Sequence, residues 1–294
     1  MPAPADPPSD FPPIVLAFAA SDPSGGAGIQ ADVLTLASMG CHPLSVLTAI
    51  TVQDTLGVEG VQPLEAEWVA DQARCLLEDM PVDAFKIGVL GSAENITVIA
   101  EILADYPDVP LVLDPVLASG RGDELASDEM LHALRELLLP RTTILTPNST
   151  EARRLADADD DEEPSLALCA HRLIGTGCEH VLITGTHEPT EQVINTLYGK
   201  AGVVRSDRWQ RLPGNYHGSG CTLASAIAAM LANGLELPEA VREAQDYTWH
   251  ALARGYRPGM GQFLPDRLFW ARDEDSEPPV EGERLPGVPD LHRH

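Results

Sequence analysis

The chain has 294 residues, a formal net charge of −26 and five cysteines. This length is sufficient to bury a hydrophobic core without disulfides or a structural metal. The acidic charge argues against nucleic acid and anionic membranes as partners, because both require basic surface. The cysteines lack Cys-x-x-Cys spacing, so we expect neither a zinc site nor a disulfide framework, and free thiols favour a reducing compartment.

The sequence shows no apolar run long enough to span a membrane and no signal peptide, so we expect a cytoplasmic protein. Lys86 and Lys200 are its two lysines, and nearly all of its positive charge is arginine. Two interpretations of the acidic charge stay open. One is a surface adapted to a salty cytoplasm, and the other is a lineage with Arg-rich codon usage and acidic tails.

Strand-like and helix-like segments alternate in a domain expected over residues 13–272, between tails at 1–12 and 273–294 that we expect to be disordered. The expected strands cover residues 14–20, 45–52, 84–90, 111–116, 143–146 and 180–185. The expected helices cover residues 28–39, 65–79, 93–104, 221–232 and 238–254, with another starting at Ser149. Residues 193–197 and 203–209 are expected to pair near one edge, and the acidic residues 157–163 to form a surface loop.

This alternation predicts a three-layer α/β/α sandwich with a central, mostly parallel sheet, because parallel strands are joined by helical crossovers. Ligands of such sheets bind at the carboxyl ends of the strands. The polar motifs of the sequence should therefore gather at that edge.

The first motif, at residues 21–28, is rich in glycine and follows the first expected strand. It lacks the lysine of a Walker loop, and an ordinary turn is the alternative. Asp32 follows within an apolar helical stripe, where a carboxylate needs a partner. It would bind the polar head of a heterocycle or make a structural hydrogen bond. Gln53 ends the second long strand; its amide suits a pyrimidine edge, unless it simply faces water.

The second motif is the glycine-rich start of an apolar helix, with Gly218, Ser219, Gly220 and Cys221 following His217. Backbone N–H groups at a helix start aim at one point, which makes an anion hole suited to a phosphoryl group. The same field would stabilise a thiolate at Cys221, which could then act as a general base. The alternative is a glycine-initiated helix with a buried, inert cysteine.

The third motif combines Asp114, at the end of an expected strand, with Asn148 and Glu151, which begin a helix. Carboxylates together with water hold Mg²⁺ against phosphate groups. The alternative is a capping box, with Asn148 as the N-cap and Glu151 as its partner, and the two roles can coexist.

In their order and spacing these motifs resemble the hydroxymethylpyrimidine/phosphomethylpyrimidine kinases of thiamine biosynthesis, which have the ribokinase-like fold. The resemblance covers residues 14–254 and is most specific at residues 21–32, 48–55, 85–90, 113–116, 146–151 and 217–223. It implies an ATP-dependent kinase of 4-amino-5-hydroxymethyl-2-methylpyrimidine, and of its monophosphate, that uses Mg²⁺. It also implies a small-molecule substrate and a homodimer.

The resemblance assigns roles to individual residues. It implies that Asp32 and Gln53 hold the aminopyrimidine, that Ala20 and Val89 line its pocket, and that Cys221 is the base. Gly218, Ser219 and Gly220 would form the anion hole. Asp114, Asn148, Glu151 and Thr184 would lie at the nucleotide, with Asp114 and Glu151 organising the metal.

Several positions depart from the family pattern. Ala20 replaces a usual glycine, Val89 a usual methionine and Thr184 a usual lysine, and the loop at residues 117–121 differs, so that Arg121 could restore positive charge. Pyridoxal, which also carries a hydroxymethyl group on a heteroaromatic ring, is the alternative substrate. A pyrimidine-binding relative without activity is the third hypothesis.

Overall fold

The structure is a computed structural model, and it describes residues 11–118, 122, 124–156 and 164–272. Residues 1–10 of the tail predicted to be disordered at 1–12 lie outside the described residues. So do the predicted disordered tail at 273–294, the predicted surface loop at 157–163 and Arg121, with the role suggested for it. Among those described, no helix is both long and apolar enough to cross a membrane.

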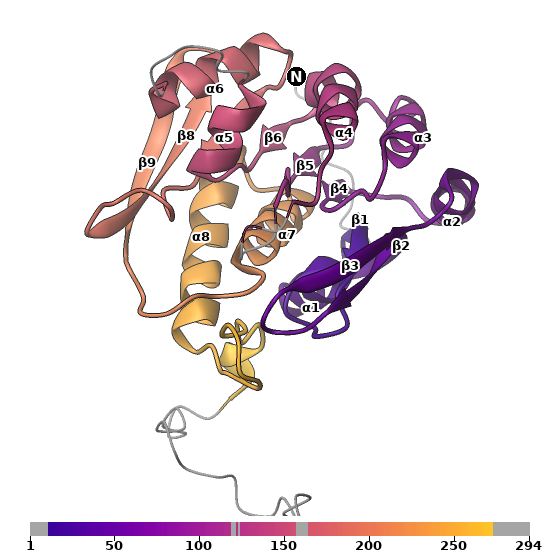
Figure 1. Cartoon of the computed structure of the whole chain (residues 1–294). Helices are drawn as coiled ribbons and strands as arrows, with labels where there is room; N and C mark the ends of the chain where they lie inside the picture. Colours follow the sequence, from indigo (N-terminus) through magenta and orange to yellow (C-terminus); the bar gives the residue numbers. More distant parts are fainter. Residues whose placement is uncertain (1–10, 119–121, 123, 157–163, 273–294) are drawn as a thin grey trace, which may run out of the picture.

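The centre of the molecule is a nine-stranded sheet in the order β3-β2-β1-β4-β5-β6-β7-β8-β9 (Figure 1). Neighbouring strands from β2 to β7 pair in parallel, and β3, β8 and β9 are antiparallel to their neighbours. The bounds are β1 (Ile14–Ser21), β2 (His42–Gln53), β3 (Val58–Pro63), β4 (Ala84–Ile87), β5 (Leu111–Leu113), β6 (Ile144–Leu145), β7 (His180–Ile183), β8 (Gln192–Gly199) and β9 (Gly202–Gln210).

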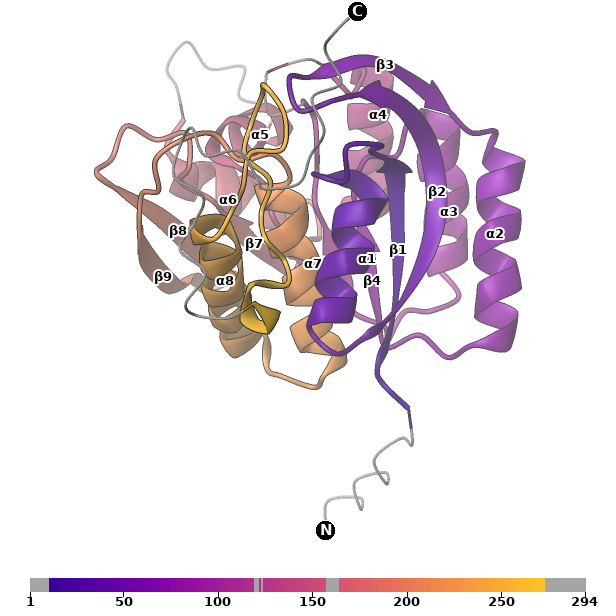
Figure 2. The ribbon, with the colours of Figure 1, turned by 90° about the horizontal axis from the view of Figure 1, so that it is seen from below.

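Helices cover both faces of this sheet, and each face has its own buried apolar cluster. Helices α1, α7 and α8 pack together on one face, with α3 and α4 behind the sheet (Figure 2). The bounds are α1 (Gly28–Ser38), α2 (Ala66–Asp79), α3 (Ala93–Leu103), α4 (Asp128–Ala133), α5 (Ser149–Leu155), α6 (Leu166–Gly175), α7 (Ser219–Ala232) and α8 (Leu237–Ala253). The predicted three-layer α/β/α fold is confirmed.

The differences from the predicted elements have local causes. The edge strand β3 was not predicted; it pairs with one neighbour and has no buried residue, so no apolar run marks it. Helices α4 and α6 were also not predicted. β4 and β5 end three residues earlier than predicted, at Ile87 and Leu113, because the residues that follow turn out of the sheet toward a cavity.

The order of the strands places that cavity. After β1 the chain adds β2 on one side, and it later returns to add β4 on the other side of β1. The loops that follow β1 and β4 therefore diverge, and such a reversal opens a crevice at the carboxyl ends of the strands.

Candidate active site

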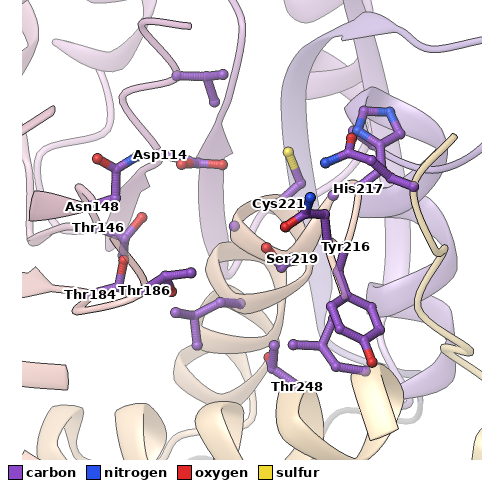
Figure 3. A pocket seen from close by; sticks show the side chains of 18 of the residues that line it. Asp114, Thr146, Asn148, Thr184, Thr186, Tyr216, His217, Ser219, Cys221 and Thr248 are labelled. Atoms are coloured by element: carbon purple, nitrogen blue, oxygen red, sulfur yellow. The ribbon is translucent and has the colours of Figure 1, made fainter. Parts of the chain in front are cut away.

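A cavity of about 690 Å³ lies at this edge of the sheet, a size typical of small-molecule sites. It brings together residues from the ends of β1, β2, β4, β5, β6 and β7 and from the start of α7. Figure 3 shows Asp114, Thr146 and Asn148 on one side of the space and Ser219, Cys221 and His217 on the other. The predicted site residues that line it are Ala20, Gln53, Val89, Asp114, Asn148, Glu151, Thr184, Gly218, Ser219, Gly220 and Cys221.

Asp32 is the predicted site residue that does not line the cavity. Its side chain is fully buried, and its Oδ1 accepts hydrogen bonds from Lys86 Nζ at 2.7 Å and Ser225 Oγ at 2.8 Å. The apolar stripe of α1 faces the core, so the carboxylate finds its partners on β4 and α7 rather than on a ligand. This geometry favours the structural alternative for Asp32, and a contact of its carboxylate with the pyrimidine stays a prediction.

The anion loop, residues 218–221, is built on a close contact between two glycines. Gly218 is the N-cap of α7 with a φ of 80°. A Cβ at this position would lie 1.8 Å from the carbonyl oxygen of Gly26, so only glycine fits. At Gly220 an added Cβ would come 3.8 Å from an Asp114 carboxylate oxygen, which places that carboxylate against the first turn of α7.

Arg267 holds this arrangement from the far end of the sequence. Its buried guanidinium donates to the carbonyl oxygen of Gly26 at 2.6 Å and to Thr222 Oγ1 at 3.1 Å. It thus ties the loop after β1 to the first turn of α7. Sequence reasoning missed Arg267, because it lies beyond the last recognisable motif and no pattern around it indicates a role.

Cys221 has the opposite acid–base character from that expected. Burial raises the pKa of its thiol to about 12, against the positive charge of Lys86, and the carboxylates Asp114 and Asp32 add to the rise. In the protein without ligands the neutral thiol is therefore the favoured form, and the role of Cys221 as the base stays a prediction. The position of Cys221, at the start of α7 and in the cavity wall, is as predicted.

Asp114 and Glu151 form a pair of carboxyl groups with raised proton affinity. Burial raises the pKa of Asp114 to about 6. Burial, and then the charge of Asp114, raise the pKa of Glu151 to about 8. Asp114 Oδ2 is buried and has no hydrogen-bond partner. An unsatisfied carboxylate oxygen beside a second carboxyl group fits a divalent cation.

Within the described residues no group of three or more His, Cys, Asp or Glu could hold a metal. Two carboxyl groups completed by water and phosphate oxygens suit Mg²⁺ better than a site made of protein ligands alone. Glu151 also caps α5. Its Oε2 accepts from the Asn148 N–H, and Asn148 Oδ1 accepts from the Glu151 N–H, both at 2.9 Å. The capping box is therefore present.

On the other side of the cavity, Gln53 contacts His217, which contacts Asp22. The Gln53 amide nitrogen and His217 Nε2 are 2.9 Å apart, and His217 Nε2 lies 2.8 Å from Asp22 Oδ2. Burial disfavours the charged form of Asp22, but hydrogen bonds, first that from His217, outweigh it and lower its pKa to about 2. Asp22 lies in the first glycine-rich motif and His217 opens the second. Nothing in the sequence indicated that these two residues contact each other.

Thr184 lies in the cavity wall at the position where the family usually has a lysine, so this position supplies no positive charge. The cavity instead holds Arg211, whose guanidinium donates to the carbonyl oxygens of Thr186 at 2.8 Å and Glu188 at 3.0 Å. Since carbonyl oxygens do not neutralise it, Arg211 keeps a positive charge at this end of the cavity.

Comparisons with known proteins agree with this geometry. The sequence profile of the family described as phosphomethylpyrimidine kinase matches residues 22–266. The hydroxymethylpyrimidine/phosphomethylpyrimidine kinase of Streptomyces coelicolor is 41% identical over 254 residues, which are 85% of this chain and 92% of that protein.

Two solved structures share the fold. The phosphomethylpyrimidine kinase of Clostridium difficile superposes with a TM-score of 0.71 at 35% identity, over 82% of this chain and 99% of that one. The Bacillus subtilis pyridoxal kinase, in complex with ADP, gives 0.81 at 27% identity, over 89% and 100%. The cavity, its anion loop and these matches lead to one conclusion: the chain belongs to the phosphomethylpyrimidine kinase family, with the ribokinase-like fold, and is a kinase.

Proposed function

We propose that this protein transfers the γ-phosphoryl group of ATP to the hydroxymethyl group of 4-amino-5-hydroxymethyl-2-methylpyrimidine, and then phosphorylates the monophosphate, in thiamine biosynthesis. The observation that carries the proposal is that one cavity joins three parts. These are the Gln53 amide, the anion loop at residues 218–221, and the carboxyl groups of Asp114 and Glu151.

The aminopyrimidine would bind at the end of the cavity formed by Gln53, Ala20 and Val89. An amide both donates and accepts, which matches the amino group and neighbouring ring nitrogen of the substrate. Ala20 and Val89 offer apolar surface to the ring. Placed there, the hydroxymethyl group lies toward the anion loop, which begins directly after His217.

The alcohol oxygen would attack the γ-phosphorus while the bond to the β-phosphate oxygen breaks and ADP leaves. Little covalent help is needed in such a transfer, so the protein positions groups and stabilises charge. The N–H groups at the start of α7 would receive the transferred phosphoryl oxygens. Cys221 would accept the proton of the alcohol after its thiol has lost its own proton to water, a loss that Lys86 and the N–H groups at the start of α7 favour and burial opposes.

The nucleotide phosphates would lie between the anion loop and Asp114, with Asn148, Glu151 and Thr184 along the same wall. Asp114 and Glu151 would hold Mg²⁺, which neutralises phosphate charge when bound. Arg211 adds positive charge at the nucleotide end, where Thr184 supplies none.

A coupled assay of ADP release, run with the aminopyrimidine alcohol and Mg-ATP, tests the proposal. We expect saturable turnover that Cys221→Ser reduces and that Cys75→Ser, an exposed cysteine far from the motif in sequence, leaves unchanged. Binding of the pyrimidine without ADP release would instead favour the non-catalytic relative.

Pyridoxal remains the second candidate substrate, because the pyridoxal kinase of B. subtilis has the same fold at 27% identity. Competition between the two alcohols measures their relative kcat/KM directly. We expect a preference for the aminopyrimidine, and a clear preference for pyridoxal would reverse the assignment.

We also propose a homodimer. Ile50 and Val52 are two residues apart near the end of β2 and are 50% and 63% exposed, and Leu56 follows at 43%. Apolar surface of this kind suits contact with a second copy. Light scattering at micromolar concentration should give the dimer mass, and Val52→Asp should shift it toward the monomer.

A further inference from the structure

Thr51 and His217 lie on either side of the Gln53 amide. Each of them determines whether the amide oxygen or the amide nitrogen can lie beside it. On one side Thr51 Oγ1 lies 3.1 Å from the amide. The same hydroxyl lies 2.8 Å from the carbonyl oxygen of Ser21. A carbonyl oxygen only accepts, so the single hydroxyl hydrogen of Thr51 is given to Ser21, and toward Gln53 the hydroxyl oxygen must accept. The amide group beside Thr51 is therefore the NH₂.

On the other side the neighbour is His217, and its Nε2 must carry a hydrogen. Asp22 Oδ2, at 2.8 Å, is a carboxylate oxygen that already accepts from the Ala27 N–H at 2.7 Å. Its pKa of about 2 keeps Asp22 ionised, and so unable to donate, at neutral pH. His217 Nε2 is thus a donor whether the imidazole is neutral or charged. A protonated Nε2 has no lone pair that could accept from the amide NH₂, so the amide atom beside it, at 2.9 Å, is the oxygen, which shares the Nε2 hydrogen with Asp22.

The two restrictions are independent and agree. As placed, the amide has Nε2 beside His217 and Oε1 beside Thr51. A half-turn about the last side-chain bond exchanges them, and oxygen and nitrogen of an amide are assigned from their hydrogen bonds. The imidazole cannot move aside easily. A Cβ at Gly26 would lie 2.2 Å from its ring, and the His217 N–H donates to the Phe263 carbonyl at 2.8 Å.

We infer that Asp22, His217 and Thr51 lock the Gln53 amide in one orientation, with its oxygen toward His217 and its NH₂ toward Thr51, and thereby fix which way round the substrate ring binds. Asp22 and Thr51 are positioning residues that act through other side chains. The inference rests on the proposed function for its substrate, though not for the lock itself.

The locked amide offers the cavity one acceptor on the His217 side and one donor on the Thr51 side. A 4-aminopyrimidine offers a donor, its amino group, next to an acceptor, its ring nitrogen. The two edges match in one direction, with the amino group toward His217. The hydroxymethyl carbon is attached next to the amino carbon, so this direction turns the reacting alcohol toward Gly218. A ring bound the other way would turn the alcohol away from the anion loop.

The 4-oxo analogue of the substrate tests the lock, because it presents a carbonyl acceptor and a ring N–H in place of donor and acceptor. The wild type should prefer the amino compound strongly in kcat/KM, since mismatched buried polar groups are costly. Asp22→Asn can donate to His217 and so releases the amide. We expect this variant and Thr51→Val to lower the amino-to-oxo ratio about tenfold or more.

Two controls accompany the variants. Thr51→Ser keeps the hydroxyl and should restore the ratio. Asp54→Asn makes the same chemical change one residue from Gln53, in a turn where Asp54 accepts from Leu56 and Gly57, and should leave the ratio unchanged. An unchanged ratio in both folded Asp22→Asn and Thr51→Val would overturn the lock.

A second measurement needs no turnover and keeps the inference testable if Asp22→Asn does not fold. Long-range ¹H–¹⁵N correlation, with His217 assigned by His217→Gln, reports which ring nitrogen carries hydrogen. We expect a protonated Nε2 in the wild type near neutral pH, and an unprotonated Nε2 would overturn the lock. If the wild type fails to phosphorylate the aminopyrimidine, the proposed function fails, while this spectrum still decides the lock.

Discussion

The ammonium group of Lys86 lies 2.7 Å from the carboxylate of Asp32, and neither side chain is exposed to solvent. Ser225 donates to the same carboxylate oxygen. Burial favours the neutral form of Lys86, but Asp32, Cys221 and Asp114 together raise its pKa above its ordinary value. One cation therefore stays charged in the core, directly beneath the groups proposed to handle the phosphoryl transfer.

Removing Lys86 should destabilise the fold strongly, because an unpaired Asp32 carboxylate would remain buried. We expect Lys86→Met to lower the free energy of unfolding by about 3–5 kcal/mol in urea denaturation. The double variant Lys86→Met/Asp32→Leu should recover much of the loss. Lys200→Met, at an exposed lysine, should stay within about 0.5 kcal/mol of the wild type. Equal losses in the single and double variants would contradict the ion-pair account.

Neutralising Glu151 should stabilise the ligand-free protein while impairing catalysis. The folded-state pKa of Glu151, about 8, lies above its ordinary value of 4.5. The folded protein therefore binds this proton more tightly than the unfolded chain, and the resulting stability is present below pH 4.5 and lost as the pH rises through about 8. Glu151→Gln cannot lose a proton, so its Tm should exceed that of the wild type increasingly over this range.

The same variant should lose about 10–100-fold in activity with Mg-ATP, because one proposed metal ligand is gone. Glu101→Gln, at an exposed position on α3, serves as the matched control for both measurements. If the Tm of Glu151→Gln is below that of the wild type at every pH, the Glu151 carboxylate stabilises the fold, and the account of an unfavourably buried charge is contradicted.

Alkylation should reveal the raised proton affinity of Cys221. With its pKa near 12, iodoacetamide should label Cys221 slowly at neutral pH, and the rate should rise about tenfold per pH unit in the alkaline range. Exposed Cys75 should react first. In a Cys75→Ser background, mass spectrometry therefore measures the labelling of Cys221 without the contribution of Cys75. Labelling of Cys221 at neutral pH as fast as that of Cys75 would contradict the buried thiol.

Catalysis by Cys221 has its own test. Cys221→Ser should keep substrate binding and lose about 10²–10⁴-fold in kcat, because a serine hydroxyl is a weaker acid than even the buried thiol and forms the basic anion less readily. Cys221→Asp should retain measurable activity with its pH optimum moved downward. Wild-type turnover by Cys221→Ser would place catalysis on the anion loop and the metal site alone.

Salt should stabilise this chain. A net charge of −26 repels itself, and screening reduces the repulsion. We expect a higher Tm at molar salt than at low salt, measured by calorimetry. A Tm that does not rise would favour the lineage interpretation of the composition over adaptation to salt.

The periodicity of the sequence was sufficient to predict α1, α7 and the central strands, since α1 buries one stripe at helical spacing and α7 and the central strands bury nearly continuous apolar runs. The periodicity could not predict β3. This strand lies at the edge of the sheet, pairs with β2 alone and buries no residue, so no apolar pattern marks it. For the site, local motifs identified Cys221 and Asp114. For Asp32 the sequence could not separate a ligand from a buried partner, because a carboxylate in an apolar stripe is compatible with both. Its partner Lys86 lies far away in the sequence.

The close contact of Gly26 with Gly218, fastened by Arg267, has a consequence for how the protein is made. Synthesis on the ribosome proceeds from the first residue onward, so Gly26 is made 241 residues before Arg267, which binds its carbonyl oxygen. Until residue 267 has emerged, the guanidinium that bridges the two glycine-rich turns is absent. The sheet can form as its strands emerge. The contact between the loop after β1 and the start of α7 is completed last, because it needs Arg267. We therefore expect a nascent chain stalled before Arg267 to be largely folded but inactive.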